Sequence, residues 1–388
     1  MDIKKFTNEF IQHVRSMYGD GFIPLHRPVF DYREKELVSG CIESNFVSSA
    51  GKEISMFEKG ISDITGSKFA ISTISGTAAL HVVLHALGAN QDTEVITQCL
   101  SFVATANAIA YCGAKPVFLD VEEETGTLST NLLLRFLEEN TYQHGGKCFN
   151  KETNKHIIAC IPMHTFGHPC DIDEIVDICA TFNVVLVEDA AEALGSYRRG
   201  CHVGNKALAA TYSFNGNKIV TTGGGGCITT NDKTLAERLK HLTTTAKRAH
   251  PYEYFHDEIG FNYRLPNLNA CLGIAQLEKF ERFVEIKRDV FLNYANFVAD
   301  QYGCKLWKER SKCRSNYWLN ALSFSSSKEK SLFLKETNAN SIMTRPIWSL
   351  LTTLPQYALC QSLLDGTAKR LYNTTVNIPS SVPKLHLC

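Results

Sequence analysis

The sequence predicts an α/β protein in which helices cover both faces of a mainly parallel sheet. From residue 68 onward, short apolar segments alternate with segments of helical periodicity, which is the order that a parallel sheet with crossover helices requires. The chain has 388 residues, of which 44% are hydrophobic. That is enough to bury a large core and to form two domains.

The elements follow one another in a regular order. A polar helical stretch opens the chain, and residues 45–51 form a turn ahead of an amphipathic helix that begins near Lys52. Strands are predicted at residues 69–73, 94–97, 116–119, 156–162 and 184–189. Helices are predicted at residues 76–87, 104–112, 130–139, 171–181, 234–242 and 271–299, and residues 140–155 are a polar insertion. A boundary near residue 260 divides a large domain, 1–260, from a smaller C-terminal one, 261–388.

Composition argues against several classes of function. The formal net charge is zero and charges are spread along the chain, so no nucleic-acid partner is expected. No run of about 18 apolar residues occurs, so we expect a cytoplasmic protein with no membrane span. The fourteen cysteines include no Cys-x-x-Cys pair, and we expect no metal. Cys112, Cys160, Cys179 and Cys271 lie in apolar runs and are predicted to be buried free thiols.

Lys218 has an unusual sequence environment. It lies among small polar and apolar residues, and four consecutive glycines follow at 223–226. A lysine amine shielded from water can attack an aldehyde to form a Schiff base, and glycines let the backbone approach a flat ligand. The alternative is a solvated surface hairpin. However, Gly76, Phe102, Asp189 and Lys218 all lie at or just after predicted strand ends, where sheets of this kind bind ligands.

Two further groups could serve the same ligand. Gly76 and Thr77 open a helix directly after a strand, so free amides and a hydroxyl could bind an anion, although such a helix start is common without a ligand. Asp189 ends an apolar strand and should meet a cation or several donors, although it could equally cap the next helix. A lysine, an anion cradle and a buried carboxylate together fit pyridoxal 5'-phosphate (PLP).

Five motifs of the chain, taken in order, resemble those of a known family. They are Gly76-Thr-Ala-Ala-Leu, Ser101-Phe-Val-Ala-Thr-Ala-Asn, Glu188-Asp-Ala-Ala-Glu, Ser213-Phe-Asn-Gly-Asn-Lys-Ile-Val-Thr-Thr-Gly and Gly260-Phe-Asn-Tyr-Arg. The chain resembles the DegT/StrS sugar aminotransferases from about residue 22 to 379. The resemblance implies a fold-type I PLP enzyme, with a seven-stranded sheet between helices in the large domain and a smaller α/β domain.

The resemblance also implies roles around the cofactor ring. Lys218 would form the Schiff base, and Asp189 would pair with the pyridine nitrogen. Phe102 would stack on the ring, and His164 resembles a residue beside it. Glu192 would face the phenolic oxygen, where it would have to be protonated or share a proton with the cofactor.

The phosphate is expected to be bound by residues from two subunits. The resemblance places Gly76, Thr77 and Ser213 at the phosphate in one subunit. Asn262, with Arg264 beside it, resembles a ligand that the partner subunit supplies. A homodimer with shared active sites follows from this assignment.

Some positions depart from the common family pattern and suggest a branch. Many relatives have Asn at Ser75, Trp at Phe46 and a glutamate within the glycine run. The four-glycine form, together with residues 242–247, 315–320 and 344–348, instead resembles the branch that serves legionaminic acid and related bacillosamine-type glycans. That branch implies transfer of the amino group of L-glutamate to C4 of a UDP-linked 2-acetamido-4-keto-6-deoxyhexose. The expected substrate-binding residues are Phe46, Ser48, Lys247, Arg248, Arg345 and Trp348.

Three other functions are alternatives to a sugar aminotransferase. A PLP-dependent sugar dehydratase of the same family would have histidine in place of Lys218. A catalytically silent regulatory homologue would keep the fold without binding the cofactor productively. A dinucleotide-binding dehydrogenase would need Gly-x-Gly-x-x-Gly between a strand and a helix, and residues 223–226 do not have that spacing.

Overall fold

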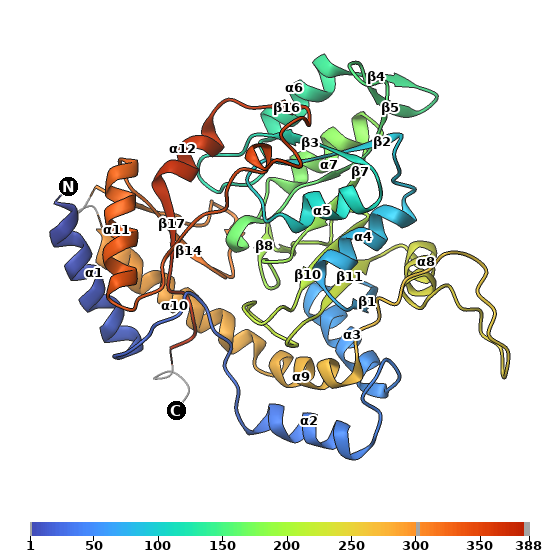
Figure 1. Cartoon of the computed structure of the whole chain (residues 1–388), viewed down its shortest axis with the longest axis horizontal. Coiled ribbons are helices and arrows are strands. Elements are labelled where there is room, and N and C mark those ends of the chain that lie inside the picture. The colour runs from blue at the N-terminus through green and yellow to red at the C-terminus, as the bar shows by residue number, and fades with distance from the viewer. Residues whose placement is uncertain (1, 300–302, 384–388) are drawn as a thin grey trace.

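The main sheet has the architecture that the sequence predicts. The computed structural model describes residues 2–299 and 303–383 (Figure 1), so residues 1, 300–302 and 384–388 of the two predicted domains lie outside the described residues. The strand order is β1 (Phe69–Thr73), β11 (Gly226–Thr230), β10 (Ala209–Ser213), β7 (Val185–Asp189), β6 (His156–Ile161), β2 (Thr93–Gln98), β3 (Lys115–Leu119) and β16 (Ser362–Leu363). Neighbours from β10 to β16 are parallel, and β11 is antiparallel to both of its neighbours. The prediction of a mainly parallel sheet is confirmed.

Helices cover both faces of this sheet because successive strand residues point to opposite sides. Val95 packs with α4 (Gly76–Ala86), α5 (Ala104–Tyr111) and α8 (Lys233–Thr243). The next residue, Ile96, packs with α6 (Thr130–Asn140) and α7 (Ile172–Thr181). At the edge of the sheet formed by β1, α3 (Lys52–Thr65) packs against β1 and against α9 (Asn267–Leu277).

The polar insertion contains structure that the sequence analysis missed. It forms the hairpin β4 (Thr141–His144) and β5 (Lys147–Asn150), which joins the main sheet through β6. Gly145 and Gly146 both have positive φ at its two-residue turn. Two adjacent glycines between short alternating segments are a signal for this hairpin.

A smaller antiparallel sheet lies beside the main one. Its order is β12 (Lys305–Leu306), β14 (Asn320–Ser323), β17 (Thr375–Ile378) and β15 (Arg345–Pro346). The first helix, α1 (Ile3–Tyr18), lies beside α11 (Ser327–Ala339) (Figure 1). It packs with α11 and with α10 (Phe280–Val298) through Phe6, Phe10, Tyr294 and Phe333. The N-terminus therefore contacts the C-terminal elements, while the boundary near residue 260 stays a prediction.

The long helix expected over residues 271–299 is two helices. It is interrupted at Lys279, whose backbone lies outside the helical region and whose Nζ contacts Asp31 and Glu34. Glu34 belongs to α2 (Tyr32–Glu43), which begins with a capping box at Asp31 and was not predicted. Because α9 packs on α2 and α3 while α10 contacts β12, the two helices serve different partners.

The remaining elements are short. They are β8 (Tyr197–Arg198), β9 (Cys201–His202) and β13 (Cys313–Arg314) in a third sheet, α12 (Thr367–Thr374), and the 3-10 turns η1 (Thr165–Gly167) and η3 (Leu351–Thr353). Every cysteine in the described ranges is a free thiol; Cys160, Cys179 and Cys271 are buried as predicted, but Cys112 is only half-buried. No helix within the described residues combines the length and apolar character that crossing a bilayer would take.

Candidate active site

A cavity of about 320 Å³ lies where the main strands end. Segments that follow β1, β2, β6, β7 and β10 line it, and the loop from β10 to β11 closes one side. Its lining includes Gly76, Thr77, Phe102, Asp189, Glu192, Ser213, Lys218 and Trp348. The fold thus brings together eight of the residues that the sequence analysis selected.

The start of α4 forms the anion-binding end of the cavity. Ser75 caps the helix, since its Oγ accepts the Ala78 amide at 3.1 Å. The amides of Gly76 and Thr77 belong to the first helical turn, where no carbonyl of the same helix can accept them. A Cβ on Gly76 would lie 3.0 Å from the Cβ of Ser213, so glycine lets the helix start approach β10 closely.

Lys218 lies at the centre of the lining. Its side chain is 12% exposed, and its Nζ lies 3.3 Å from Oε1 of Glu192. The same Nζ lies 3.9 Å from the centroid of the Trp318 ring, whose Nε1 donates to the Asn217 carbonyl at 2.8 Å. Trp318 therefore both covers the lysine amine and holds the peptide just before it.

Glu192 has an altered acidity in this position. Burial raises the pKa of its carboxyl to about 7, although the nearby Lys218 acts in the opposite direction. Its other oxygen accepts the Phe166 amide at 2.9 Å. A carboxyl that holds its proton near neutral pH can donate to an oxygen anion, as the expected role beside a phenolic oxygen requires.

Asp189 is a buried carboxylate, and no lysine, arginine or histidine in the described part of the chain forms an ion pair with it. Thr105 Oγ1 donates to it at 2.6 Å and the Ala191 amide donates at 3.1 Å. Burial raises the pKa of Asp189, and these donors together with the field of Lys218 only partly oppose that rise. A protonated pyridine nitrogen would supply the missing positive charge. The donor set and the helix start therefore fit PLP.

His164 lies behind the cavity rather than in its lining. Its Nδ1 accepts the Cys170 amide at 3.0 Å, so Nε2 carries the proton and donates to Glu188 at 2.8 Å. Burial would raise the pKa of Glu188, but His164 and the amides of Gly204 and Ala207 outweigh it and lower that pKa. His164 thus supports the strand that carries Asp189.

Besides Trp318, the aromatic residues Phe102 and Trp348 line the cavity. Phe102 is 51% exposed, and its ring centroid lies 6.4 Å from that of Trp348. Trp348 also packs against Phe166, at 4.7 Å between centroids. An exposed Phe102 is free to stack on a planar ring that enters the cavity.

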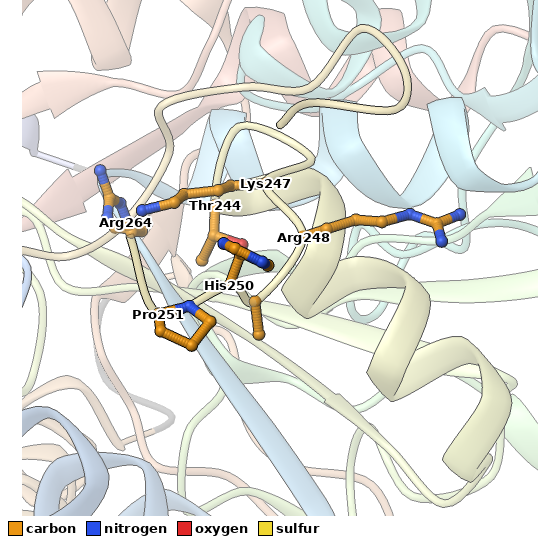
Figure 2. A pocket seen from close by; sticks show the side chains of 7 residues that line it. Thr244, Lys247, Arg248, His250, Pro251 and Arg264 are labelled. Atoms are coloured by element: carbon orange, nitrogen blue, oxygen red, sulfur yellow. The ribbon is translucent and has the colours of Figure 1, made fainter. Parts of the chain in front are cut away.

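The other expected substrate residues lie outside this cavity. Lys247 and Arg248 line a separate pocket of about 530 Å³ with Thr244, His250 and Arg264 (Figure 2). Figure 2 shows Arg248 extending away from Lys247, and its Nε donates to Asp257 at 2.7 Å.

Four more of the expected residues are exposed elsewhere. Phe46, at 63% exposure, and Ser48 lie on the loop before α3, where the Ser48 carbonyl accepts the Asn267 amide at 2.6 Å. Arg345 is exposed on β15. Asn262 is exposed, and its Oδ1 accepts from Arg264 at 3.3 Å.

Two contributors to the site were not assigned from the sequence. Thr105 lies within the quoted 101–107 motif, so its hydroxyl could have been selected. Trp318 lies a hundred residues after Lys218, and only the fold brings them together. Asn316, two residues earlier, donates to the carbonyls of Glu192 and Leu194, which anchors the Trp318 segment to the loop after β7.

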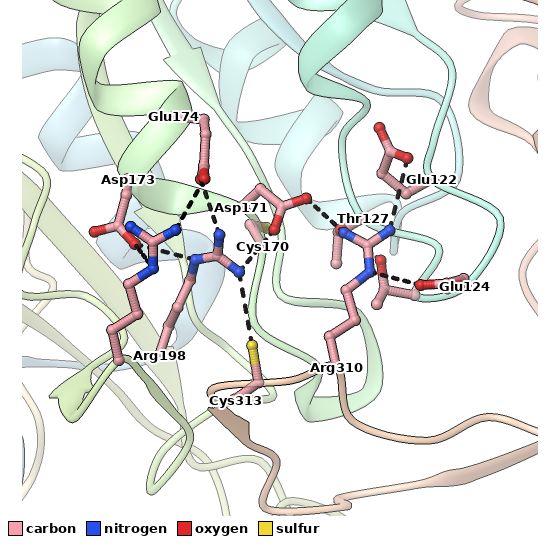
Figure 3. A network of polar contacts seen from close by, with 12 residues as sticks. Glu122, Glu124, Thr127, Cys170, Asp171, Asp173, Glu174, Arg198, Arg310 and Cys313 are labelled. Carbon is pink, nitrogen blue, oxygen red and sulfur yellow. Dashed lines mark hydrogen bonds and ion pairs between the residues drawn. The ribbon is translucent and has the colours of Figure 1, made fainter.

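A second charged cluster surrounds Arg198, next to the same loop (Figure 3). Arg198 is 8% exposed and lies within 3.1 Å of Asp171, Asp173 and Glu174. Arg310 contacts Asp171 as well, together with Glu122 and Glu124. In this cluster each of the two guanidinium groups, buried in Arg198 and partly exposed in Arg310, faces three carboxylates.

The fold and the lysine-centred cavity define a fold-type I PLP-dependent enzyme. The profile of the DegT/DnrJ/EryC1/StrS aminotransferase family matches residues 28–386. The GDP-perosamine synthase of Escherichia coli O157:H7 is 35% identical over 338 residues, which cover 87% of each chain. That of Vibrio cholerae is 33% identical and covers 92% of this chain and 94% of its own. The solved structure of Helicobacter pylori PseC, an aminotransferase involved in the biosynthesis of pseudoaminic acid, superposes with a TM-score of 0.83 at 24% identity, covering 92% of this chain and 94% of PseC.

The chain belongs to the DegT/DnrJ/EryC1/StrS aminotransferase family, whose cofactor is PLP. The predicted family and cofactor are confirmed. Membership in the legionaminic acid branch stays a prediction, since the curated relatives above carry the name GDP-perosamine synthase.

Proposed function

We propose that this aminotransferase transfers the amino group of L-glutamate to C4 of a nucleotide-linked 4-keto-6-deoxyhexose. The main support for this proposal is the position of the Lys218 amine, which lies in the cavity beside Glu192 and against the ring of Trp318. A lysine at this position also argues against the dehydratase alternative. The family supplies the reaction type, and the relatives' names supply the sugar class.

The roles of the residues follow from their contacts. PLP, when bound, supplies an aldehyde and an electron sink for the carbon that loses its proton. Lys218 would hold the aldehyde and, once released, move the proton at the substrate carbon. Asp189, oriented by Thr105 and Ala191, would keep the ring nitrogen protonated. Glu192 would donate to the phenolic oxygen, Phe102 would stack on the ring, and Gly76, Thr77 and Ser213 would hold the phosphate.

The diphosphate of the substrate needs cations, and among the described residues that line the cavity Lys218 is the only lysine or arginine. Lys247 and Arg264 lie in the pocket of Figure 2, on the loop between α8 and α9. We assign this loop to the cavity of a partner subunit in a homodimer, where Asn262 would reach the phosphate of PLP. The exposure of Asn262 in the single chain supports that assignment.

A mixing experiment tests the shared site. Lys218→Ala and Asn262→Ala homodimers should each be inactive or nearly so. Heterodimers isolated through two different affinity tags should regain up to about a quarter to half of wild-type activity, since one of two sites would then be intact. Verified heterodimers without any recovery would exclude a shared site.

Two nucleotides compete as the carrier of the sugar. The resemblance favours UDP with a 2-acetamido group, in the formation of legionaminic acid or bacillosamine-type glycans. The relatives' names favour GDP. We propose the UDP-linked 2-acetamido sugar, because the four-glycine run and the segments around Trp318 and Trp348 match that branch.

A substrate panel tests the proposal. Holoenzyme is incubated with glutamate and UDP-2-acetamido-2,6-dideoxyhexos-4-ulose, its 2-hydroxy counterpart, or a GDP-linked 4-keto-6-deoxyhexose, and the aminated sugar is measured by mass spectrometry. The 2-acetamido sugar should give the highest kcat/KM. Preference for GDP would correct the nucleotide. If glutamate changes the cofactor absorbance but no keto sugar is aminated, the sugar substrate class is excluded.

A further inference from the structure

The glycine run at 223–226 is only partly required by the backbone. Gly223 has φ +79°, a conformation that L side chains rarely adopt. A Cβ on Gly225 would lie 2.2 Å from Thr222 Oγ1, and a Cβ on Gly226 would lie 2.4 Å from the backbone of Ser75. Conformation or close packing therefore accounts for three of the four glycines.

Gly224 is the exception. It does not occur among the glycines with positive φ, and a Cβ built on it meets no atom of the described residues within 4 Å. Its carbonyl accepts from Thr222 Oγ1 at 2.8 Å and from Asn269 Nδ2 at 3.2 Å, so the loop conformation is held by its neighbours. The backbone at this position would tolerate a side chain.

The missing side chain opens the active-site cavity. Gly224 is part of the lining that includes Lys218 and Glu192. A volume of about 320 Å³ is at the small end for ligand pockets. That space must hold the cofactor and the reacting part of the sugar, so a side chain at 224 would occupy volume that ligands need.

A glycine that neither conformation nor packing requires lowers the stability of the protein relative to alanine, because it gives the unfolded chain more conformational freedom. We infer that Gly224 is a specificity-determining residue that leaves room for a sugar-ring substituent larger than hydroxyl, namely the 2-acetamido group. This inference rests on the proposed function and concerns the same site.

The polar surroundings suit an acetamido group. Asn215 and Asn217 line the same cavity, and both side chains are exposed. The Asn215 side chain donates to that of Asn217 at 3.2 Å, which leaves further amide donor and acceptor positions. An amide on the substrate can therefore exchange its bonds to water for bonds to the protein.

The test compares two keto sugars on the same nucleotide. UDP-2-acetamido-2,6-dideoxyhexos-4-ulose and its 2-hydroxy counterpart are given to wild type, Gly224→Ala and Gly224→Leu holoenzymes. Gly40→Ala is the matched control, because its Cβ also meets nothing within 4 Å but lies on α2, away from the cavity. Melting temperature, the glutamate half-reaction and calorimetric binding of UDP-N-acetylglucosamine are measured in parallel.

Gly224→Leu should lower kcat/KM for the 2-acetamido sugar by about tenfold to a hundredfold relative to the 2-hydroxy sugar, with a smaller shift for Gly224→Ala. Binding of UDP-N-acetylglucosamine should weaken in the same order, and the melting temperature should not fall, because the substituted residue has less freedom in the unfolded chain. A slower glutamate half-reaction lowers the rate with both sugars alike and cancels from their ratio, whereas equal losses for both sugars, no loss or a lower melting temperature would each overturn the inference. A wild type that aminates neither sugar would instead defeat the proposed function itself.

Discussion

Two neighbouring groups of charged residues differ in how completely they are paired. In the cavity, Asp189 and Glu192 lie near one cation, Lys218, and burial raises the pKa of both carboxyls. In the cluster of Figure 3, Arg198 and Arg310 each contact three carboxylates. A fully paired cluster is costly to break, whereas an incompletely paired one leaves charge for a ligand to complete.

The same contrast occurs between adjacent residues of β7. Glu188 faces His164 and two backbone amides, and its pKa is lowered against the effect of burial. Asp189 faces the cavity with two donors, and its pKa is raised. Because successive strand residues point to opposite faces, one strand end supplies both a structural carboxylate and one available to the cofactor.

The largest expected effect is that of Lys218→Ala. Removal of the amine should lower turnover by on the order of a thousandfold or more, because in the proposed reaction both the bond to the aldehyde and the proton transfer depend on it. Borohydride trapping followed by peptide mass spectrometry should label Lys218 in wild type only. The Arg198 cluster should be unaffected, so in protein stripped of PLP a melting temperature several degrees below that of wild type would contradict the separation of the two regions.

Asp189→Asn should reduce kcat by on the order of a hundredfold to a thousandfold, since an ion pair at about 4 Å is worth about 4 kcal/mol at an effective dielectric of 20. Single-turnover kinetics with glutamate measure this loss. Glu188→Gln is the matched control on the same strand, and it should lower stability more than it slows the half-reaction. If the two variants lose the same amount of activity and of stability, the assignment of different roles to Glu188 and Asp189 is wrong.

Arg198→Met should lower the free energy of unfolding by about 2 kcal/mol, because it removes the most buried of the cations that face Asp171, Asp173 and Glu174. Urea denaturation measures the change. Arg199→Met removes a side chain that is 51% exposed and should cost less than about 1 kcal/mol. The glutamate half-reaction should proceed at the wild-type rate in both folded variants. A slower half-reaction in Arg198→Met alone would show that the Arg198 cluster contributes to the function of the cavity.

Glu192→Gln should change the pH dependence of stability in protein stripped of PLP. The folded carboxyl keeps its proton up to a pKa of about 7, whereas the ordinary value is 4.5. The folded state therefore binds more protons between these values, and stability from this group falls as pH rises, by about 2 kcal/mol between pH 5 and pH 8. Other groups titrate in this range, so the quantity to measure is the difference between variant and wild-type slopes. Parallel curves would contradict the raised pKa.

Local patterns in the sequence were enough for five strands of the ten-stranded main sheet and for part of the site. Apolar segments alternating with helical ones predicted the strand and helix order, because burial on both faces of a sheet shapes each segment separately. Gly76, Asp189 and Lys218 could be selected because they lie at or just after strand ends, which parallel strands bring to one edge.

The sequence by itself therefore determined the layered fold and the residues at the strand ends. Only the tertiary structure decided that Trp318 covers Lys218, that His164 faces Glu188, that Glu192 holds its proton and that one expected helix is two. These features depend on contacts between segments up to a hundred residues apart and on how far each group is removed from water. Periodicity reports which face of a segment is buried but not which distant side chain it meets.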